Sequence, residues 1–445
     1  MKTLLKKYDH LIFAVSGLLF AFILSRVPLI VDDEVRHAML AGSSSLGDIL
    51  DYALSFYTGA TANDSRILII IPAVFFAAGP KIVWAAFMGL DLYLLFFSLK
   101  ILFPCSNRLT CALAICACVM LYSFSILSSA GWITTMSAYF APICLALVSF
   151  IPFKLLADKQ SLKPYMYALF IPAIIYSANS EQILIPEFIC AFFIMLYLKK
   201  RDGRYALYPM IMMSLCIASA VFTFMTPANS ERMNEEAALF PEFMRFNILN
   251  KAELGLESAC YLLTESGRPF YIFCCILIAM MIFRKYKSAF VRILSVLLIL
   301  SAAAGLLIYI PSLPHYSPVP PCGLFFPPNY GFRVFAKYML LTGSATLFFF
   351  GLLIALDDGF DRIICTGLFA GGFLSRMIIG FVPSIYASGE RTAAVMDFSV
   401  IVACVCLASE YYEGSSDKKK TGTILIPVFS FMIVAGFISL FNAVS

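Results

Sequence analysis

Charged side chains are scarce in this chain of 445 residues: Asp, Glu, Lys and Arg make up 13% of it, and hydrophobic residues 61%. A soluble protein carries about 25% charged residues, so this chain lacks the polar surface that a globule needs in water. The scarcity excludes soluble, secreted, fibrous and disordered proteins and predicts a membrane protein. The net charge of +5 gives no support to nucleic-acid binding.

Histidine is nearly absent, with three residues, and no Cys-x-x-Cys pair occurs among the 14 cysteines. A metal site built from His and Cys ligands is therefore not expected. Most cysteines lie in apolar runs and are interpreted as small core residues. Cys260 and Cys322 lie in long polar segments predicted outside the membrane, where a disulfide between them stays an open alternative.

Apolar segments follow one another along nearly the whole chain, separated by Pro, Gly and charge clusters. A membrane-spanning helix needs about 20 mostly apolar residues. The segments are 11–30, 82–103, 109–128, 133–153, 164–180, 181–198, 205–226, 269–283, 289–310, 335–356, 361–382, 391–410 and 422–442. The sequence thus predicts an all-α polytopic membrane protein, a single transmembrane domain over 1–445 with about 13 helices, or about 11 to 13 given uncertain boundaries.

Basic residues are unevenly distributed between the loops. With the N-terminus inside, the inner segments hold 20 of the 32 Lys and Arg residues, including Lys199, Lys200 and Lys418 to Lys420. Because basic residues near helix ends stay in the cytoplasm, this bias predicts a multi-pass protein of the cytoplasmic (inner) membrane with its N-terminus inside and its C-terminus outside. A crossing at 66–78 would reverse every later loop, so this short stretch is predicted to be an interfacial helix at the outer face.

Long polar segments lie on the predicted outer side, while the inner connections are short. They are the first outer loop 31–65, the second outer loop 227–268 and the third outer loop 311–334. Binding and catalytic residues gather on loops held by a rigid scaffold. We therefore expect the functional site at the outer face.

The outer segments carry polar motifs at the ends of predicted helices. Asp32-Asp33-Glu34-x-Arg36-His37 follows the first helix, where a solvated helix end is the simpler interpretation. Trp132-x-Thr134 with Tyr139 begins another helix, and Trp132 can equally be an interfacial belt residue. A helix cap explains Asn179 or Ser180 but not the carboxylate of Glu181 beside hydrocarbon.

Two further motifs place arginines at the membrane boundary. Pro227-x-Asn229-x-x-Arg232 ends one span, and Arg391 begins another. A guanidinium suits a phosphate because it donates two parallel hydrogen bonds. Ordinary contact with lipid headgroups is the alternative interpretation.

In order and placement these motifs resemble those of one family of multi-pass bacterial proteins. The elements are Asp32-Asp33, Asn63-x-x-Arg66, Trp132-x-Thr134, Asn179-x-Glu181 and Pro227-x-Asn229-x-x-Arg232. They resemble the O-antigen glucosyltransferase-like membrane proteins, within the integral-membrane glycosyltransferases of the C-type fold. The resemblance covers about the first half of the chain, and Ala138-Tyr139 stands where the family has Asn-Tyr.

The resemblance implies a glycosyltransferase of polysaccharide biosynthesis in the cell envelope. It would move a sugar from a polyprenyl-phosphate carrier to a glycan or lipid acceptor at the outer face. Asp32 or Asp33 would be the catalytic base, assisted by Glu181. The substrate-binding residues would be Arg36, His37, Arg66, Trp132, Thr134, Tyr139, Asn179, Asn229, Arg232 and Arg391. A divalent cation between Asp32, Asp33 and Glu181 is an option, although arginines alone can serve a phosphodiester donor.

Two other functions stay open. Asp91, Glu187, Arg376 and Asp397 are charged residues inside predicted spans, which a lipid or solute transporter or flippase would use, although no internal repeat is visible. A surface-polysaccharide polymerase or ligase would share the outer arginines. Arg376 and Asp397 lie at equal depth in successive helices and are expected to form a pair.

Overall fold

The computed structural model describes residues 8–40, 45–58, 64–238, 240–264, 268–307, 332–357, 359–385 and 387–444. The regular elements within these ranges are all helical. They group into two compact units, Met1–Asn229 with Ala408–Ser445 and Ser230–Leu407. Cys322 and nearly all of the predicted loop 311–334 lie outside the described residues. The prediction of a single transmembrane domain over 1–445 stays a prediction.

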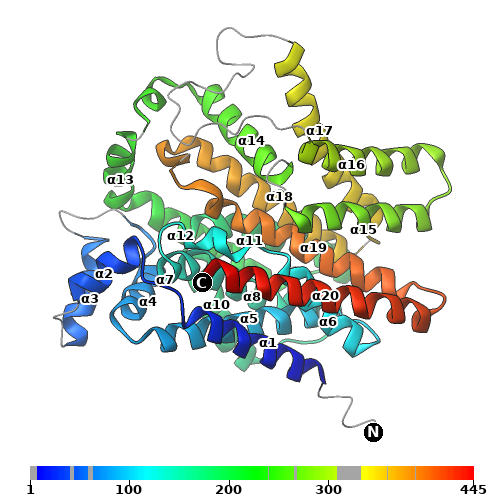
Figure 1. The fold of residues 1–445 in the computed structure, drawn as a ribbon, viewed down its shortest axis with the longest axis horizontal. Coiled ribbons are helices and arrows are strands. Elements are labelled where there is room, and N and C mark those ends of the chain that lie inside the picture. Colours follow the sequence, from blue (N-terminus) through cyan, green and yellow to red (C-terminus); the bar gives the residue numbers. More distant parts are fainter. Residues whose placement is uncertain are drawn as a thin grey trace. The chain divides into compact units, whose positions relative to one another are not determined.

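The first unit contains the N-terminal helices and the C-terminal helix (Figure 1). They are α1 Tyr8–Leu24, α2 Asp32–Leu40, α3 Leu46–Ser55, α4 Ile67–Ala78, α5 Lys81–Leu102, α6 Arg108–Met120, α7 Trp132–Thr135, α8 Ala141–Ser149, α9 Ile151–Ala157, α10 Pro164–Ala178, α11 Glu181–Asp202, α12 Leu207–Met225 and α20 Lys418–Val444. A π-helical turn, Met136–Phe140, joins α7 to α8. The segment predicted as the first outer loop thus contains two helices, α2 and α3.

The second unit, Ser230–Leu407, contains most of α13 Pro227–Ala237, then α14 Ile248–Thr264, α15 Pro269–Lys285, α16 Ala289–Leu307, α17 Phe332–Ala355 and α18 Phe360–Ile378, and α19 Ala394–Glu413 up to Leu407. The predicted second outer loop, 227–268, therefore holds α13, a 3-10 turn at Pro241–Arg245 and α14. α14 and α15 meet at 78°.

Arg268 stabilises the break between α14 and α15. Its Nε donates to the carbonyl oxygen of Leu262 over 2.8 Å, and its guanidinium forms a buried ion pair with Asp397 of α19. Arg376 donates to Ser258 Oγ over 2.5 Å and to Thr392. Asp397 thus has a partner that sequence reasoning did not single out, and the expected pair with Arg376 stays a prediction.

Seven helices among the described residues are long and apolar enough to cross a membrane. They are Lys81–Leu102, Trp132–Ala157, Glu181–Asp202, Leu207–Met225, Phe360–Phe381, Gly389–Glu413 and Lys418–Val444, and the bent pair of α14 and α15 raises the number to eight. Shorter apolar helices, including α1 and α4, account for other predicted segments. These are the features of an all-helical polytopic membrane protein. The number of about 13 crossings stays a prediction.

α1 and α5 pack closely through two glycines. A Cβ added to Gly17 would lie 2.7 Å from the carbonyl oxygen of Gly89, and one added to Gly89 would lie 2.6 Å from that of Gly17. Small residues let the backbones of membrane helices approach in this way. The contact holds α1 in place and so sets where the chain enters α2.

Gly89→Ala is expected to lower the melting temperature, because its Cβ would also lie 2.9 Å from the Cβ of Ala21. Overpacking of this kind costs about 1–3 kcal/mol. Gly343→Ala in α17 is the control, since no atom lies within 4 Å of its added Cβ. Thermal unfolding in detergent should leave Gly343→Ala at or above the parent, because Ala favours helix. Equal melting of the two variants would mean that α1 and α5 are not closely packed.

Candidate functional site

Four short helices from separate parts of the first unit pack together, at the left of the view in Figure 1. α4 contacts α2, α3 and α7, and α2 also contacts α7. Leu40, Ala53, Ile70 and Val74 form the buried apolar cluster between α2, α3 and α4. Three of the sequence motifs, those around Asp32, Arg66 and Trp132, are therefore brought to one place.

Asp33 is fully buried and caps the N-terminus of α7. Its Oδ2 accepts a hydrogen bond from the backbone N–H of Ile133 over 2.8 Å. Its Oδ1 accepts from the N–H of Thr134 over 2.9 Å and from the Thr134 hydroxyl over 2.7 Å. A carboxylate at a helix N-terminus satisfies donors that the helix cannot use. Asp33 therefore joins α2 to α7.

Thr134 links Asp33 to Arg36. The Thr134 hydroxyl accepts a hydrogen bond from Arg36 NH1 over 2.9 Å while it donates to Asp33. The Arg36 guanidinium also lies 5.3 Å from the centre of the Phe56 ring, which suits a cation–π contact. Burial raises the pKa of Asp33, although the Thr134 and Ile133 donors and the charge of Arg36 oppose this. Arg36 thus helps to compensate a buried carboxyl.

Asp32 has a different environment from Asp33 although it is its neighbour. Consecutive residues of a helix point about 100° apart, so the buried face of α2 holds Asp33 and Arg36, and Asp32 is only half-buried. Burial raises the pKa of Tyr52 in α3. The charge of Arg36 lowers this pKa, and the charge of Asp32 raises it. Tyr52 therefore lies within electrostatic reach of both side chains, and sequence reasoning missed it.

Val31, immediately before α2, has a left-handed backbone with φ of 51°. This conformation is unusual for a β-branched residue and costs about 1–3 kcal/mol. It persists because the surroundings fix the chain on both sides, through α1 and through the Asp33 cap. Backbone strain of this kind is common next to functional sites.

The motifs around Arg66 and Glu181 also meet. Ser65 Oγ donates to Glu181 Oε1 over 2.9 Å, and the backbone N–H of Leu68 donates to Asn179 Oδ1 over 3.0 Å. Asn179 therefore caps the first turn of α4, a helix more than a hundred residues away in sequence. Sequence reasoning had assigned the cap to the start of α11 instead.

Arg66 is engaged by Asp64, a residue that sequence reasoning overlooked. Nε and NH2 of Arg66 donate to the two carboxylate oxygens of Asp64 over 2.9 and 2.7 Å. Burial would lower the pKa of Arg66, but the charges of Asp64 and Glu181 raise it, with a smaller contribution from Tyr139. Arg66 therefore positions the start of α4, and its guanidinium is engaged by the Asp64 carboxylate.

The other expected residues of this unit have varied surroundings. His37 Nδ1 lies 2.9 Å from the carbonyl oxygen of Ala77, near the end of α4. Trp132 is buried, so it packs in the core of the unit. Tyr139 is half-buried in the π-helical turn, a feature often found at functional sites. Asn229 Nδ2 donates to the carbonyl oxygen of Thr223 over 2.6 Å and so caps the end of α12.

Arg232 and Arg391 belong to the second unit. Arg232 Nε donates to Glu236 Oε1 over 2.8 Å, one turn along α13. Arg391 is half-buried in the 3-10 turn Gly389–Ala393, before α19. Arg391 therefore precedes α19, whereas Arg232 lies in the middle of α13, a helix within the segment predicted as an outer loop. Their role as phosphate ligands stays a prediction.

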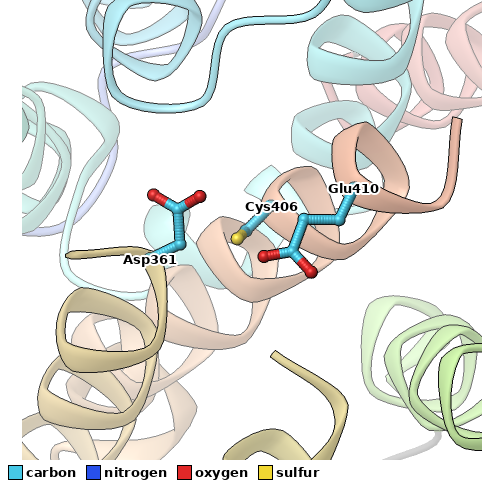
Figure 2. Close-up of side chains that lie close together, drawn as sticks. All are labelled: Asp361, Cys406 and Glu410. Carbon is cyan, nitrogen blue, oxygen red and sulfur yellow. The ribbon is translucent and has the colours of Figure 1, made fainter. Parts of the chain in front are cut away.

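A metal ion has little support in the described part of the chain. Asp32, Asp33 and Glu181 do not form a group at ligand spacing there, and both oxygens of Asp33 already accept hydrogen bonds. Figure 2 shows a different set, in which Asp361 of α18 lies near Cys406 of α19, with Glu410 one turn further along α19. Of these three residues, Asp361 and Cys406 belong to the second unit and Glu410 to the first. Two ligands are too few for a metal site.

No protein-family model, curated protein or solved structure matches the chain. The proposed relationship to membrane glycosyltransferases therefore depends on the sequence motifs alone.

Gly131→Ala is expected to disrupt the link between α2 and α7. Gly131 has φ of 101°, and an added Cβ would lie 2.5 Å from Oδ1 of Asp33. Gly203→Ala is the control: its φ of 74° is also left-handed, but no atom lies within 4 Å of its added Cβ. The left-handed helical cost of about 1–2 kcal/mol applies to Gly203, with ψ of −3°. Gly131, with ψ of 139°, lies outside that region, so its backbone strain adds to the clash with Asp33.

Thermal unfolding should therefore show a larger loss for Gly131→Ala than for Gly203→Ala, because only the first displaces Asp33. Limited proteolysis should detect new cleavage within α2 in Gly131→Ala. Identical behaviour of the two variants would contradict the described contact between Gly131 and Asp33.

Proposed function

We propose that the protein transfers a sugar from a polyprenyl-phosphate carrier to a hydroxyl group of a glycan or lipid at the outer face of the cytoplasmic membrane. The observation that supports this most is the division between two adjacent carboxylates. Asp33 is buried and fixed to α7, whereas Asp32 on the same helix is half-exposed. A helix fixed in its rotation by Asp33 thus presents the Asp32 carboxylate in one direction, as general-base catalysis requires.

Asp32 is the better candidate for the base, because the oxygens of Asp33 are occupied by backbone and hydroxyl donors. In the proposed reaction the Asp32 carboxylate takes the proton of the acceptor hydroxyl. The acceptor oxygen then bonds to the anomeric carbon, and the bond from that carbon to the phosphate oxygen breaks. The electron pair leaves with the lipid phosphate, and direct displacement inverts the anomeric centre.

The leaving phosphate needs a cation, and the arginines differ in how firmly they are engaged. Arg66 is forked onto Asp64, and Arg36 is buried between Thr134 and Phe56. Arg232 pairs with Glu236 on one helix, with about a third of its side chain exposed. The motif resemblance proposes Arg232 and Arg391 as ligands of the phosphate, and both belong to the second unit.

Transport is the second candidate, because Glu187 is a fully buried carboxyl inside α11. Ser177 Oγ lies 2.5 Å from Glu187 Oε1 and 2.8 Å from the carbonyl oxygen of Ala173. Ser149 Oγ lies 3.4 Å from the same carboxyl oxygen and 2.7 Å from the carbonyl oxygen of Ala146. Both hydroxyls donate to Glu187, so the carboxyl is held between three helices, and an intramembrane carboxyl of this kind is what a transporter would use.

Asp32→Asn is expected to reduce sugar transfer by about 10²- to 10⁴-fold with little change in melting temperature, because it removes the base and leaves the α7 cap. Glu34→Gln, on an exposed position of the same helix, should keep parental activity. Asp33→Asn should lower the melting temperature, because its amide nitrogen would face an N–H donor. Each purified variant is assayed with a polyprenyl-phosphate sugar and an acceptor glycan. Full activity of Asp32→Asn would exclude Asp32 as the base.

Glu187→Gln separates the two candidate functions. The amide oxygen can still accept from Ser177, so sugar transfer and melting temperature should remain close to the parent, whereas Glu187→Ala should lose stability through an unfilled cavity. The measurements are thermal unfolding, sugar transfer and solute uptake into proteoliposomes. Uptake by the parent that Glu187→Gln abolishes would support a proton-coupled transporter instead.

A further inference from the structure

α3 presents three different faces along its length. Ile49, Tyr52 and Ala53 pack against the apolar cluster with α4. Asp48 and Asp51 are exposed on a second face. The third face carries three leucines four residues apart, Leu46, Leu50 and Leu54, which are 66%, 43% and 38% exposed. One helix thus has a packed face, an acidic face and an exposed apolar face.

α2 repeats this arrangement beside it. Asp33, Arg36 and Leu40 are buried, and Val35 and Met39 lie on the opposite face with exposed fractions of 55% and 68%. Exposed apolar residues occur singly on ordinary protein surfaces, but rows at helical spacing on two helices of one cluster indicate a binding surface.

The position of these helices in the chain identifies what covers the surface. α3 packs on α4, and α4 leads through Gly79 and Pro80 directly into α5, a helix of membrane-crossing length. Exposed apolar residues recur on the two helices that follow, at Leu68 and Phe75 of α4 and at Ile82 and Phe87 of α5. The helices with the rows therefore pack on, and lead into, the segment that enters the membrane.

We propose that α2 and α3 lie in the headgroup region of the leaflet that α5 enters at Lys81, with Val35, Met39, Leu46, Leu50 and Leu54 inserted among the acyl chains. Such helices bind by burying apolar area and, in other proteins, by attraction of Lys and Arg to anionic lipid. Here the exposed charges near the rows are Glu34, Asp48 and Asp51. The partner is therefore a zwitterionic lipid surface, held by apolar contacts.

This placement does not depend on the proposed activity, but it has a consequence for it. Asp32 lies on α2 between the face that inserts and the face that is buried. Its carboxylate would then be at headgroup depth, where a lipid-linked phosphate is also found.

Tryptophan fluorescence in bilayers of brominated phosphatidylcholine tests the proposal. The chain has two tryptophans, Trp84 and Trp132, which are 0% and 2% exposed, so their signal can be measured in the parent and subtracted. Met39→Trp and Leu50→Trp place a probe in each apolar row. Asp48→Trp, on the acidic face of α3, is the matched control. All variants must match the parent in size-exclusion profile and melting temperature.

Bromine near the carbonyl end of the acyl chains should quench the new signal in Met39→Trp and Leu50→Trp at least about twofold more than in Asp48→Trp. Bromine near the methyl end should quench less, because the helices lie at the interface. Acrylamide should quench Asp48→Trp most. Equal bromolipid quenching on both faces of α3 would overturn the proposal. Shielding of Leu50→Trp from acrylamide without bromolipid quenching would also overturn it and would indicate a protein partner. Asp32→Asn in the Leu50→Trp background should leave the quenching unchanged even if transfer is lost.

Discussion

The carboxylate of Asp33 at the N-terminus of α7 is the interaction on which the candidate site depends. It satisfies two backbone N–H groups and the hydroxyl of Thr134, which in turn accepts from Arg36. Leaving such donors buried and unpaired would cost about 1–3 kcal/mol for each. The bonds join segments about one hundred residues apart, and because they fix the rotation of α2, they also fix the direction in which Asp32 points.

Charge balance in this part of the first unit explains why Asp32 differs from the other carboxyl groups. Asp33 is compensated by Arg36 through Thr134, and Asp64 by Arg66. Glu181 accepts from Ser65 and lies near Arg66. These contacts hold each acid in one orientation. Asp32 lies at the edge of this group of acids and is half-exposed. The group holds more carboxylates than arginines, so a phosphate would be attracted only weakly to its arginines.

The sequence predicted the helical membrane architecture, because long apolar segments have few other solutions. It also identified residues that the structure brings together, such as Asp33 with Thr134. It missed α2 and α3, because polar segments of this length were interpreted as loops, although the spacing of Leu46, Leu50 and Leu54 indicates a helix. It could not find Arg268, since nothing local marks the partner of a buried charge more than a hundred residues away. Asp64 is two residues from Arg66 and could have been found from that spacing.

Adjacent carboxylates on one helix cannot both point into the same site, because about 100° of rotation separates them. If one faces the protein interior, its neighbour turns toward the edge of that face. On α2 the buried Asp33 comes two residues after Val31, whose left-handed backbone leads the chain into the helix. The hydrogen bonds of the cap offset the free-energy cost of that strain and of burying a carboxyl. The neighbouring carboxylate of Asp32 is thereby held in a single direction. An acidic pair at the end of a membrane helix is thus best understood as one anchoring and one exposed group.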